Sequence, residues 1–421
     1  MQRLTRAVVL SDYSEERSVV VGPANLPLLQ PNQLLVRMEF ANVTTRDLGF
    51  LQGKGPVIRA LPAVPGLEGA GTVVEAGSRL KTWRFQGKRV GLFALESTLP
   101  GSWAEYVVIS SKHCFPLNDS ITFEQAAGLF LGPLTVCMFE ERLGKARGVI
   151  QTGGISSIAK AMLRLCNFRT ITCVCVISDP AEAAELADLG GKYILLSTDP
   201  DFSEKAEGLC REFEIRVGFD TAGGKVAADV LNAMVTGGVL YEYEDCLESH
   251  EITGLSPQAL IFQKKKVTGL NLFPWFQRKK SLQKFTLLRH IQQFHFIYRS
   301  DVLQTFDMTN TLEALEAVRT SNCRGNVLLH LRALPTSRLS STPATPIPAQ
   351  VEEEKKAATA SGVVAIALDE LGEDEEDRDI QQVPELPDTK FAGTMSLGRD
   401  DGGEEQGDNL SPHLDIVQHT S

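Results

Sequence analysis

The sequence predicts an α/β fold with two lobes, one β-rich and one built on a doubly wound parallel sheet, followed by a tail without a core. Three observations predict it. Short alternating apolar runs fill the first 120 residues, strand and helix patterns then alternate to about residue 280, and apolar residues thin out after Leu334. Regular alternation of strands and helices is typical of a parallel sheet, because each parallel connection needs a crossover, usually a helix.

The β-rich lobe is expected to consist of short strands separated by Gly and Pro turns. A β-rich sequence pattern returns near residue 285, so we expect this lobe to combine residues 1–125 with 285–334. The expected strands are 7–10, 34–38, 71–75, 89–93, 103–108, 302–306 and 326–331, and the expected helices are 281–297 and 311–318.

The parallel sheet is expected to occupy residues 126–284, and its first unit is residues 148–179. A strand, a glycine turn, a helix and a second strand within about 30 residues are typical of a dinucleotide-binding βαβ unit. The remaining pattern predicts strands at 192–196, 217–220 and 238–241, and helices at 122–141 (broken at Gly132-Pro133), 204–213 and 225–234.

The glycine turn is the first candidate binding site, since backbone N–H groups at the start of a helix bind pyrophosphate. A ligand-free turn would have the same pattern, because isoleucine stands at the third and sixth places of the ideal G-x-G-x-x-G. The two serines serve either as phosphate ligands or as helix caps. The candidate cofactor-binding residues here are Gly153, Gly154, Ile155, Ser156, Ser157 and Ile158.

A second candidate site follows the next strand, at Ser178 and Asp179. An acid at this place binds a ribose 2′-hydroxyl and repels a 2′-phosphate, and residues 170–190 contain no Lys or Arg. Asp179 is equally explained as the N-cap of a helix that begins at Pro180. NADH is therefore not excluded as the cofactor.

Composition and charge exclude several classes of partner. No apolar run approaches the 18 to 20 or so residues that a membrane span needs. Residues 335–421 carry 19 acidic and 6 basic side chains, whereas the first 334 residues are nearly neutral, with 34 acidic and 36 basic. A nucleic-acid partner is disfavoured, because it would require a basic face.

Eight scattered cysteines without a CxxC pair predict buried thiols in a reducing compartment. The strand pattern that starts at Ala7 leaves no room for a targeting peptide, so we expect a cytoplasmic protein. The acidic tail, residues 335–421, is expected to be disordered. Its apolar patch 363–371 is either a partner-binding helix or a linker segment.

Several spaced motifs point to one family. They are the run 62–77 (PAVPGLEGAGTVVEAG), Gly87-Lys88-Arg89-Val90, Pro133-Leu134-Thr135 and Phe219-Asp220-Thr221-Ala222-Gly223-Gly224. With them the chain resembles the medium-chain dehydrogenase/reductase superfamily, as a divergent relative of the quinone oxidoreductases and 2-enoyl thioester reductases. The resemblance implies a GroES-like lobe, a Rossmann lobe and NADPH as cofactor.

Zinc is not expected. In the zinc-dependent branch of the superfamily, a Cys and a His ligand stand where this chain has Thr44 and Leu67. Neither side chain suits a tetrahedral zinc site.

The resemblance also implies site residues. Thr135, Tyr243 and Leu272 would contact the cofactor, and Thr44 and Asp47 would lie near the nicotinamide. Many enoyl reductases place a Tyr where this chain has Gly55, so Thr44, Asp47 or water is the expected proton source.

Two functions remain open. The first is a zinc-independent NAD(P)H-dependent oxidoreductase that reduces an enone, quinone or enoyl thioester. The second is a family member without catalysis, which acts as an interaction protein through its tail. Departures from the family pattern at Gly55, Gly132, Ile155 and Glu244 favour the second. A homodimer through the edge of the nucleotide-binding sheet is a further implication of the resemblance, and the substrate stays undetermined.

Overall fold

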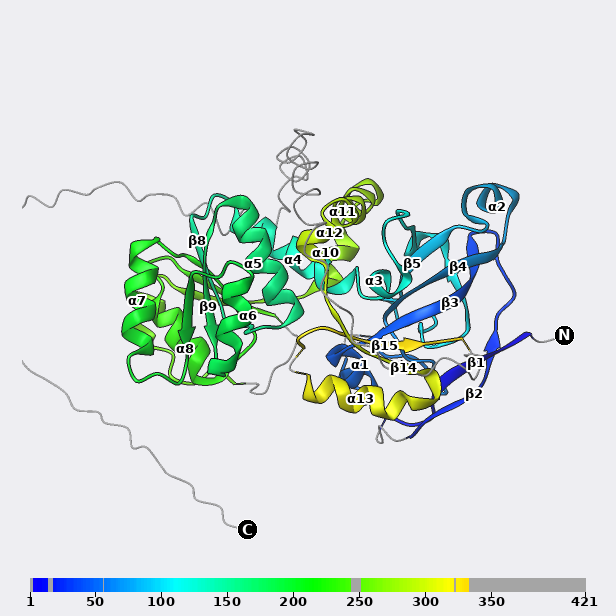
Figure 1. Ribbon diagram of the computed structural model, residues 1–421, viewed down its shortest axis with the longest axis horizontal. Coiled ribbons are helices and arrows are strands. Elements are labelled where there is room, and N and C mark those ends of the chain that lie inside the picture. Colours follow the sequence, from blue (N-terminus) through cyan, green and yellow to red (C-terminus); the bar gives the residue numbers. More distant parts are fainter. Residues whose placement is uncertain (1–2, 14–17, 56, 244–250, 322, 333–421) are drawn as a thin grey trace, which may run out of the picture. The chain divides into compact units, whose positions relative to one another are not determined.

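The predicted α/β fold class is confirmed in the computed structural model, which describes residues 3–13, 18–55, 57–243, 251–321 and 323–332. A β-rich lobe and a parallel sheet with helices make up the fold (Figure 1). Glu244 and the acidic tail, with its apolar patch 363–371, lie outside the described residues.

The β-rich lobe is built on a seven-stranded sheet in the order β14-β15-β3-β4-β5-β7, with β6 paired to β3. All its pairs are antiparallel except β14 with β15. Beside it lies the antiparallel pair β1 and β2. The strands are β1 (Arg3–Leu10), β2 (Val19–Leu26), β3 (Gln33–Val43), β4 (Glu68–Ala76), β5 (Arg89–Phe93), β6 (Tyr106–Ser110), β7 (Cys114–Pro116), β14 (Val302–Asp307) and β15 (Asn326–His330).

Four helices accompany these strands in the chain: α1 (Thr45–Leu51), α2 (Arg79–Phe85), α3 (Phe123–Ala127) and α13 (Thr311–Thr320). The core of the lobe contains Trp103, whose Nε1 donates to the carbonyl of Asn42 at 3.0 Å. This bond satisfies the indole N–H, which would otherwise be buried without a partner.

The second sheet has six parallel strands in the order β10-β9-β8-β11-β12-β13. This is the order of the dinucleotide-binding folds, which reverses direction between the first strand and the fourth. The reversal lies here between β8 and β11. The strands are β8 (Gly148–Gln151), β9 (Thr172–Ile177), β10 (Tyr193–Leu196), β11 (Val217–Asp220), β12 (Val239–Tyr243) and β13 (Lys266–Leu270).

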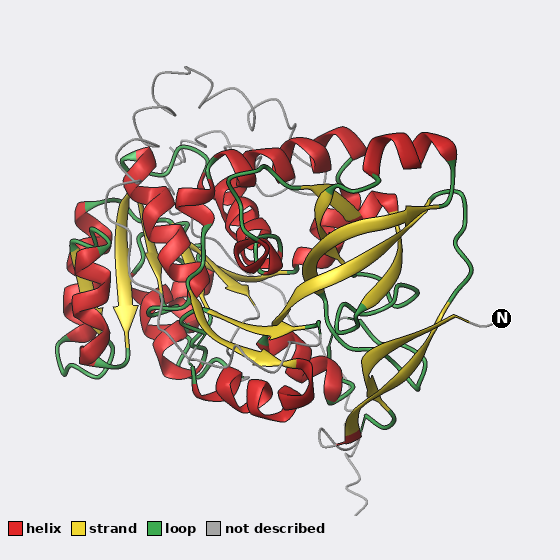
Figure 2. Ribbon diagram, turned by 45° about the vertical axis from the view of Figure 1, so that its right-hand side comes forward, coloured by secondary structure: helices red, strands yellow, loops and turns green. Residues whose placement is uncertain are grey.

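Helices cover both faces of this sheet (Figure 2). Cys173 and Cys175 face the side of α4 and α5, as their spacing predicts, with their Sγ atoms 3.8 Å apart. Val174 and Val176 face α7 and α8. The helices are α4 (Leu131–Leu143), α5 (Ser157–Arg169), α6 (Ala183–Asp188), α7 (Phe202–Glu212), α8 (Gly224–Ala233), α9 (Pro257–Ile261), α10 (Leu272–Arg278), α11 (Ser281–Gln293) and α12 (His295–Tyr298).

Three expectations need correction. The helix predicted over 122–141 is two helices, α3 and α4, and Gly132-Pro133 lies in the first turn of α4. Proline is tolerated there because the first-turn N–H groups have no partner within the helix. The helix expected over 281–297 likewise divides into α11 and α12 near Phe294. Six cysteines are free and buried as expected, but Cys323 is disulfide-bonded.

No helix among the described residues is long and apolar enough to cross a membrane.

Candidate functional site

A cavity of about 350 Å³ opens at the carboxyl ends of β12 and β13, two strands from the reversal point. Ligands of open α/β sheets bind at this edge, and the volume is at the lower end of the range for small-molecule sites. Three predicted cofactor residues, Thr135, Tyr243 and Leu272, line it together. The other lining residues are Arg46, Met138, Glu242 and the segment 269–273.

Thr135 and Tyr243 are held in place by their neighbours. The Thr135 hydroxyl donates to the carbonyl of Leu131 at 2.9 Å, which leaves its oxygen able to accept from a ligand N–H. The Tyr243 ring packs edge-on against Phe139 at 4.8 Å between centroids, and Phe139 stacks on Phe219 at 4.1 Å. This aromatic packing fixes one wall of the cavity.

The glycine turn after β8 requires its glycines. Gly154 has φ +54°, and a Cβ at Gly153 would lie 2.9 Å from the hydroxyl oxygen of Tyr243. Ile155 is buried in the hydrophobic core and lines neither of the cavities described here. The isoleucine at the third place of the motif therefore leaves the cavity open.

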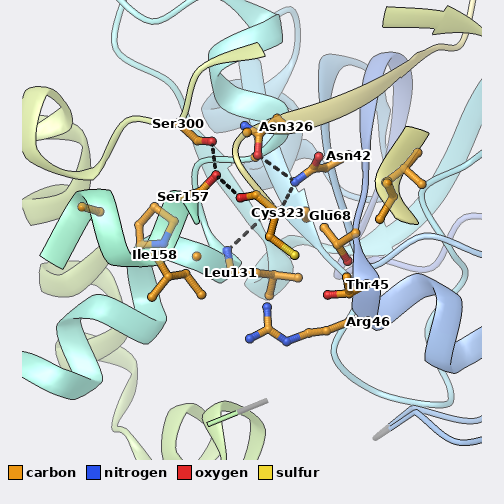
Figure 3. A pocket seen from close by; sticks show the side chains of 18 of the residues that line it. Asn42, Thr45, Arg46, Glu68, Leu131, Ser157, Ile158, Ser300, Cys323 and Asn326 are labelled. Atoms are coloured by element: carbon orange, nitrogen blue, oxygen red, sulfur yellow. Dashed lines mark hydrogen bonds between the residues drawn. The ribbon is translucent and has the colours of Figure 1, made fainter. Parts of the chain in front are cut away.

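Backbone N–H groups at the start of α5 already donate hydrogen bonds to other groups of the protein. The Ser156 hydroxyl accepts from the N–H of Ala159 at 3.2 Å, which is the capping role. The N–H of Ser157 donates to the carbonyl of Cys323 at 2.8 Å, and its hydroxyl bonds Ser300 at 2.7 Å (Figure 3). A pyrophosphate at this helix end would have to displace the Cys323 carbonyl.

The space in front of α5 is accordingly narrow. This second cavity holds about 60 Å³, well below the roughly 300 Å³ at which small-molecule sites begin. Ser157 and Ile158, two of the predicted cofactor residues, line it together with Thr44 and Glu68. Arg46 lines both cavities.

Ser178 and Asp179 lie exposed at the end of β9. Asp179 accepts from the N–H of Ala181 at 2.9 Å, so it caps the short helix that begins at Pro180. A different acid covers the glycine turn. A Cβ at Gly154 would lie 2.7 Å from Oε2 of Glu182, a buried side chain 3.8 Å from Arg324.

Glu182 lies in no motif of the sequence and was not predicted as a site residue. Burial is the main cause that raises the pKa of its carboxyl. In its ionised form the carboxyl would repel a phosphate placed on the turn.

The two catalytic candidates form one unit at the start of α1. The backbone N–H and the hydroxyl of Thr44 both donate to Oδ2 of Asp47, each at 2.8 Å. Asp47 is buried and lines neither of the two cavities, whereas Thr44 lines the narrower one. Burial raises the pKa of Asp47 to about 6. Above that pH Asp47 is a carboxylate that accepts the hydroxyl proton of Thr44. The hydroxyl oxygen of Thr44 can then only accept a hydrogen bond from a ligand.

Glu68 is a buried acid within the family motif 62–77, for which no role was predicted. Its carboxyl accepts from Asn42 Nδ2 at 2.9 Å and from the N–H groups of Leu131 and Phe130 at 3.0 and 3.3 Å. It therefore joins β4 to the start of α4, where a helix favours negative charge. Burial raises the pKa of Glu68 to about 7.

No group of three or more His, Cys, Asp or Glu side chains that could hold a metal ion occurs among the described residues. Thr44 and Leu67 remain unsuited to zinc by their chemistry. Zinc independence stays a prediction.

Comparisons with known proteins agree with this architecture. Residues 30–119 match the alcohol dehydrogenase GroES-like domain. The mitochondrial enoyl-[acyl-carrier-protein] reductase of Arabidopsis thaliana is 28% identical over 286 residues, covering 66% of this chain and 74% of the relative. The Rattus norvegicus protein of the same name is 24% identical over 280 residues, with 64% and 73% covered.

Two solved structures have the same fold. A Mesorhizobium loti protein described as an NADPH:quinone reductase has a TM-score of 0.66 at 23% identity, covering 78% of this chain and 98% of its own. A mutant form of the enoyl thioester reductase from Candida tropicalis has a TM-score of 0.66 at 18% identity, covering 78% and 100%.

Proposed function

We propose that this chain, which belongs to the medium-chain dehydrogenase/reductase superfamily that its motifs predicted, is a zinc-independent NAD(P)H-dependent oxidoreductase. Its substrate would carry an activated double bond, as in an enone, a quinone or an enoyl thioester. The observation that carries the proposal is the cavity at the carboxyl edge of the parallel sheet, where Thr135, Tyr243 and Leu272 meet. The named activities of the enoyl reductase relatives support it.

In this proposal the residues of the larger cavity hold the nicotinamide. Thr135 would accept a hydrogen bond from the ligand, and Tyr243 and Leu272 would give the ring an apolar wall. The cofactor supplies the hydride when it is bound. The chain must orient the acceptor, exclude water and supply one proton.

Thr44 and Asp47 remain candidates for the proton only where Asp47 is protonated. Below a pH of about 6 a neutral Asp47 can donate to Thr44, which can then donate into the narrower cavity. At neutral pH this route is closed, because Asp47 is then an acceptor. A working enzyme at neutral pH would need another donor.

The cofactor's adenosine end is proposed to lie beyond the glycine turn, near β9. Glu182 and Asp179 disfavour a 2′-phosphate there, which favours NADH. The relatives favour NADPH, because one structure of the same fold, a mutant of Etr1p, is a complex with NADP and crotonyl-CoA. We therefore keep NAD(P)H as the proposed cofactor.

The arrangement of the chain is part of the proposal. Residues 1–125 with 285–334 would form the catalytic lobe, 126–284 the nucleotide-binding lobe and 335–421 a tail that binds a protein partner. We propose a homodimer through β13, the last strand of its sheet, because Ile261 and Phe262 beside it are 67% and 77% exposed. We propose a cytoplasmic location, although the relatives are named mitochondrial.

The alternative is a protein that keeps the fold without catalysis. One observation favours it specifically, the Cys323 carbonyl that occupies the N–H of Ser157 at the start of α5. A chain that never binds dinucleotide would keep this bond permanently, and it would act through its tail.

An activity assay distinguishes the oxidoreductase from the protein without catalysis. The full chain is incubated with NADPH or NADH and either crotonyl-CoA or a benzoquinone, and the loss of dihydronicotinamide absorbance is followed. Consumption that depends on both cofactor and acceptor supports the oxidoreductase. A chain that consumes neither cofactor with either acceptor favours the interaction protein.

A further inference from the structure

Two carboxyl side chains lie next to each other at the carboxyl ends of two neighbouring strands of the parallel sheet. Asp220 ends β11 and Glu242 stands beside it in β12, and the two residues are partners in the strand register. Asp220 is fully buried and accepts from the Thr152 hydroxyl at 2.6 Å and from the N–H of Gly223 at 2.8 Å. Glu242 is half-buried, and its buried Oε1 has no hydrogen-bond partner in the described part of the chain.

At neutral pH the pair of Asp220 and Glu242 holds one proton, whereas two separate carboxyl groups would both be ionised. No Lys, Arg or His of the described residues forms an ion pair with either acid, and two adjacent like charges resist ionising together. Burial, followed by the charge of Asp220, raises the pKa of Glu242 to about 8. Burial also raises the pKa of Asp220, but the hydrogen bonds it accepts from Thr152, Gly223, Glu242 and Ala222 favour its ionised form. The proton therefore resides on Glu242 at neutral pH.

Glu242 faces the cavity that holds Thr135 and Tyr243. Among the described residues, the other titratable groups around it are Asp220 from β11, Tyr243 from its own strand and Arg46 from α1, which also lines the cavity. The lining residues from α4 and from the segment 269–273 carry no charge. A neutral acid here is compatible with an anionic cofactor, whereas an ionised pair would repel it.

We propose that Glu242 is the proton donor of this site, a neutral carboxylic acid that Asp220 keeps protonated until a reduced substrate takes its proton. The inference rests on the proposed function and supplies the donor that Thr44 cannot be at neutral pH. The substrate is reduced by a hydride from the reduced nicotinamide dinucleotide, which adds to the β-carbon and leaves an enolate.

The proton step then balances. The O–H bond of Glu242 breaks, a C–H bond forms at the α-carbon of the enolate, and Glu242 is left as a carboxylate. It regains a proton from water, so each turnover consumes one hydride equivalent and one proton. Arg46, which lines the same cavity, favours the transient anions electrostatically.

The first readout needs no turnover. Infrared spectra of the full chain without cofactor are recorded from about pH 6 to about pH 10, where a protonated carboxyl gives a carbonyl band distinct from a carboxylate. We expect wild type to lose a component of this band near pH 8. We expect Glu242→Gln to lack that component, and Asp220→Asn to move its midpoint down by about one unit or more. Glu204→Gln, an exposed acid on α7, should behave as wild type.

The second readout is the rate. Glu242→Gln should lower kcat about 10²-fold to 10⁴-fold, the usual contribution of a general acid, while the Kd for the dinucleotide and the thermal unfolding stay close to wild type. In wild type kcat should fall as the pH rises above about 8, because Glu242 is then ionised. Asp220→Asn should shift this fall to lower pH, which tests the pairing through a second variant.

The outcomes separate this inference from the proposed function. A wild-type chain that turns over while Glu242→Gln keeps its kcat refutes the donor role alone, as does a wild type without the band component near pH 8. A wild-type chain that binds and reduces nothing refutes the proposed function and the donor role together.

Discussion

Replacing Glu68 tests whether its carboxyl joins the two lobes as the hydrogen bonds indicate. Glu68→Ala leaves the N–H groups of Leu131 and Phe130 without an acceptor, and it leaves the amide of Asn42 with only its 3.4 Å bond to Asn326. A buried donor without a partner costs about 1–3 kcal/mol. Since the Phe130 bond is long and a water can enter the vacated space, we expect a total loss of about 2–5 kcal/mol in the free energy of unfolding.

Glu68→Gln should cost far less. Its carbonyl oxygen can accept from both helix N–H groups, as Oε2 does now, and its NH₂ can donate to Asn42 Oδ1, a buried atom without a partner in the described residues. This exchange needs only a flip of the Asn42 amide and gives up the weak 3.4 Å bond to Asn326. At about pH 5, where Glu68 is protonated in the fold, we expect a change within about 1 kcal/mol.

The difference between wild type and Glu68→Gln should depend on pH. The pKa of Glu68 is raised from 4.5 to about 7 in the fold, so wild type gains stability from the protonated acid below pH 4.5 and loses it as the pH rises to about 7. The loss amounts to about 1.4 kcal/mol per pH unit for one proton. The free energy of unfolding of Glu68→Gln lacks this dependence on pH. The variant therefore becomes more stable relative to wild type as the pH rises from 4.5 to about 7.

Urea unfolding of the three proteins at about pH 5 and about pH 8 measures both effects. A Glu68→Gln variant as unstable as Glu68→Ala would refute the proposed exchange of hydrogen bonds. A pH-independent difference between wild type and Glu68→Gln would show that Glu68 titrates in the fold as it does in the unfolded chain.

Four further predictions concern the cofactor, the assembly and the tail. Glu182→Gln should lower the Kd for NADPH several-fold because it removes a carboxylate from above the glycine turn; an unchanged Kd would place the phosphates elsewhere. Thr135→Ala should raise the Kd about fivefold by removing a hydrogen bond of about 1 kcal/mol, and Thr135→Ser should restore it; equal values for Ala and Ser would contradict the contact. Phe262→Asp should shift a dimer toward monomer in sedimentation equilibrium, and the same mass for both proteins would exclude this edge. A chain of residues 1–332 should keep the wild-type Tm and Kd, and a lower Tm would show that the tail stabilises the fold.

The elements that the sequence predicted well are those with a clear local pattern. The strands expected at 89–93 and 217–220 coincide with β5 and β11, where short apolar runs are bounded by charged or turn residues. The short helix α1 was missed because its seven residues include Gly49 and make fewer than two helical turns, too few for a periodic apolar pattern. β2 was missed because Gly22-Pro23 interrupts its pattern, which an edge strand tolerates.

The site was predictable only where a motif carried it. Thr135 lies in a recognisable Pro-Leu-Thr run, and the structure brings it to Tyr243 and Leu272. The pair of Asp220 and Glu242 depends on the strand order, because residues 22 positions apart become neighbours only when β11 and β12 pair in register. Glu182 ends the short helix that begins at Pro180, and no local pattern specifies that its side chain reaches the glycine turn.

The most direct test of the central claim, that the cavity beside Thr135 binds a nicotinamide, is equilibrium titration of the full chain with NADPH and NADH. The fluorescence of the dihydronicotinamide is followed, with Thr135→Ala as the matched variant. We predict saturable binding of at least one dinucleotide at micromolar concentration, weakened in Thr135→Ala. Fluorescence that does not saturate with either dinucleotide at millimolar concentration would contradict the claim.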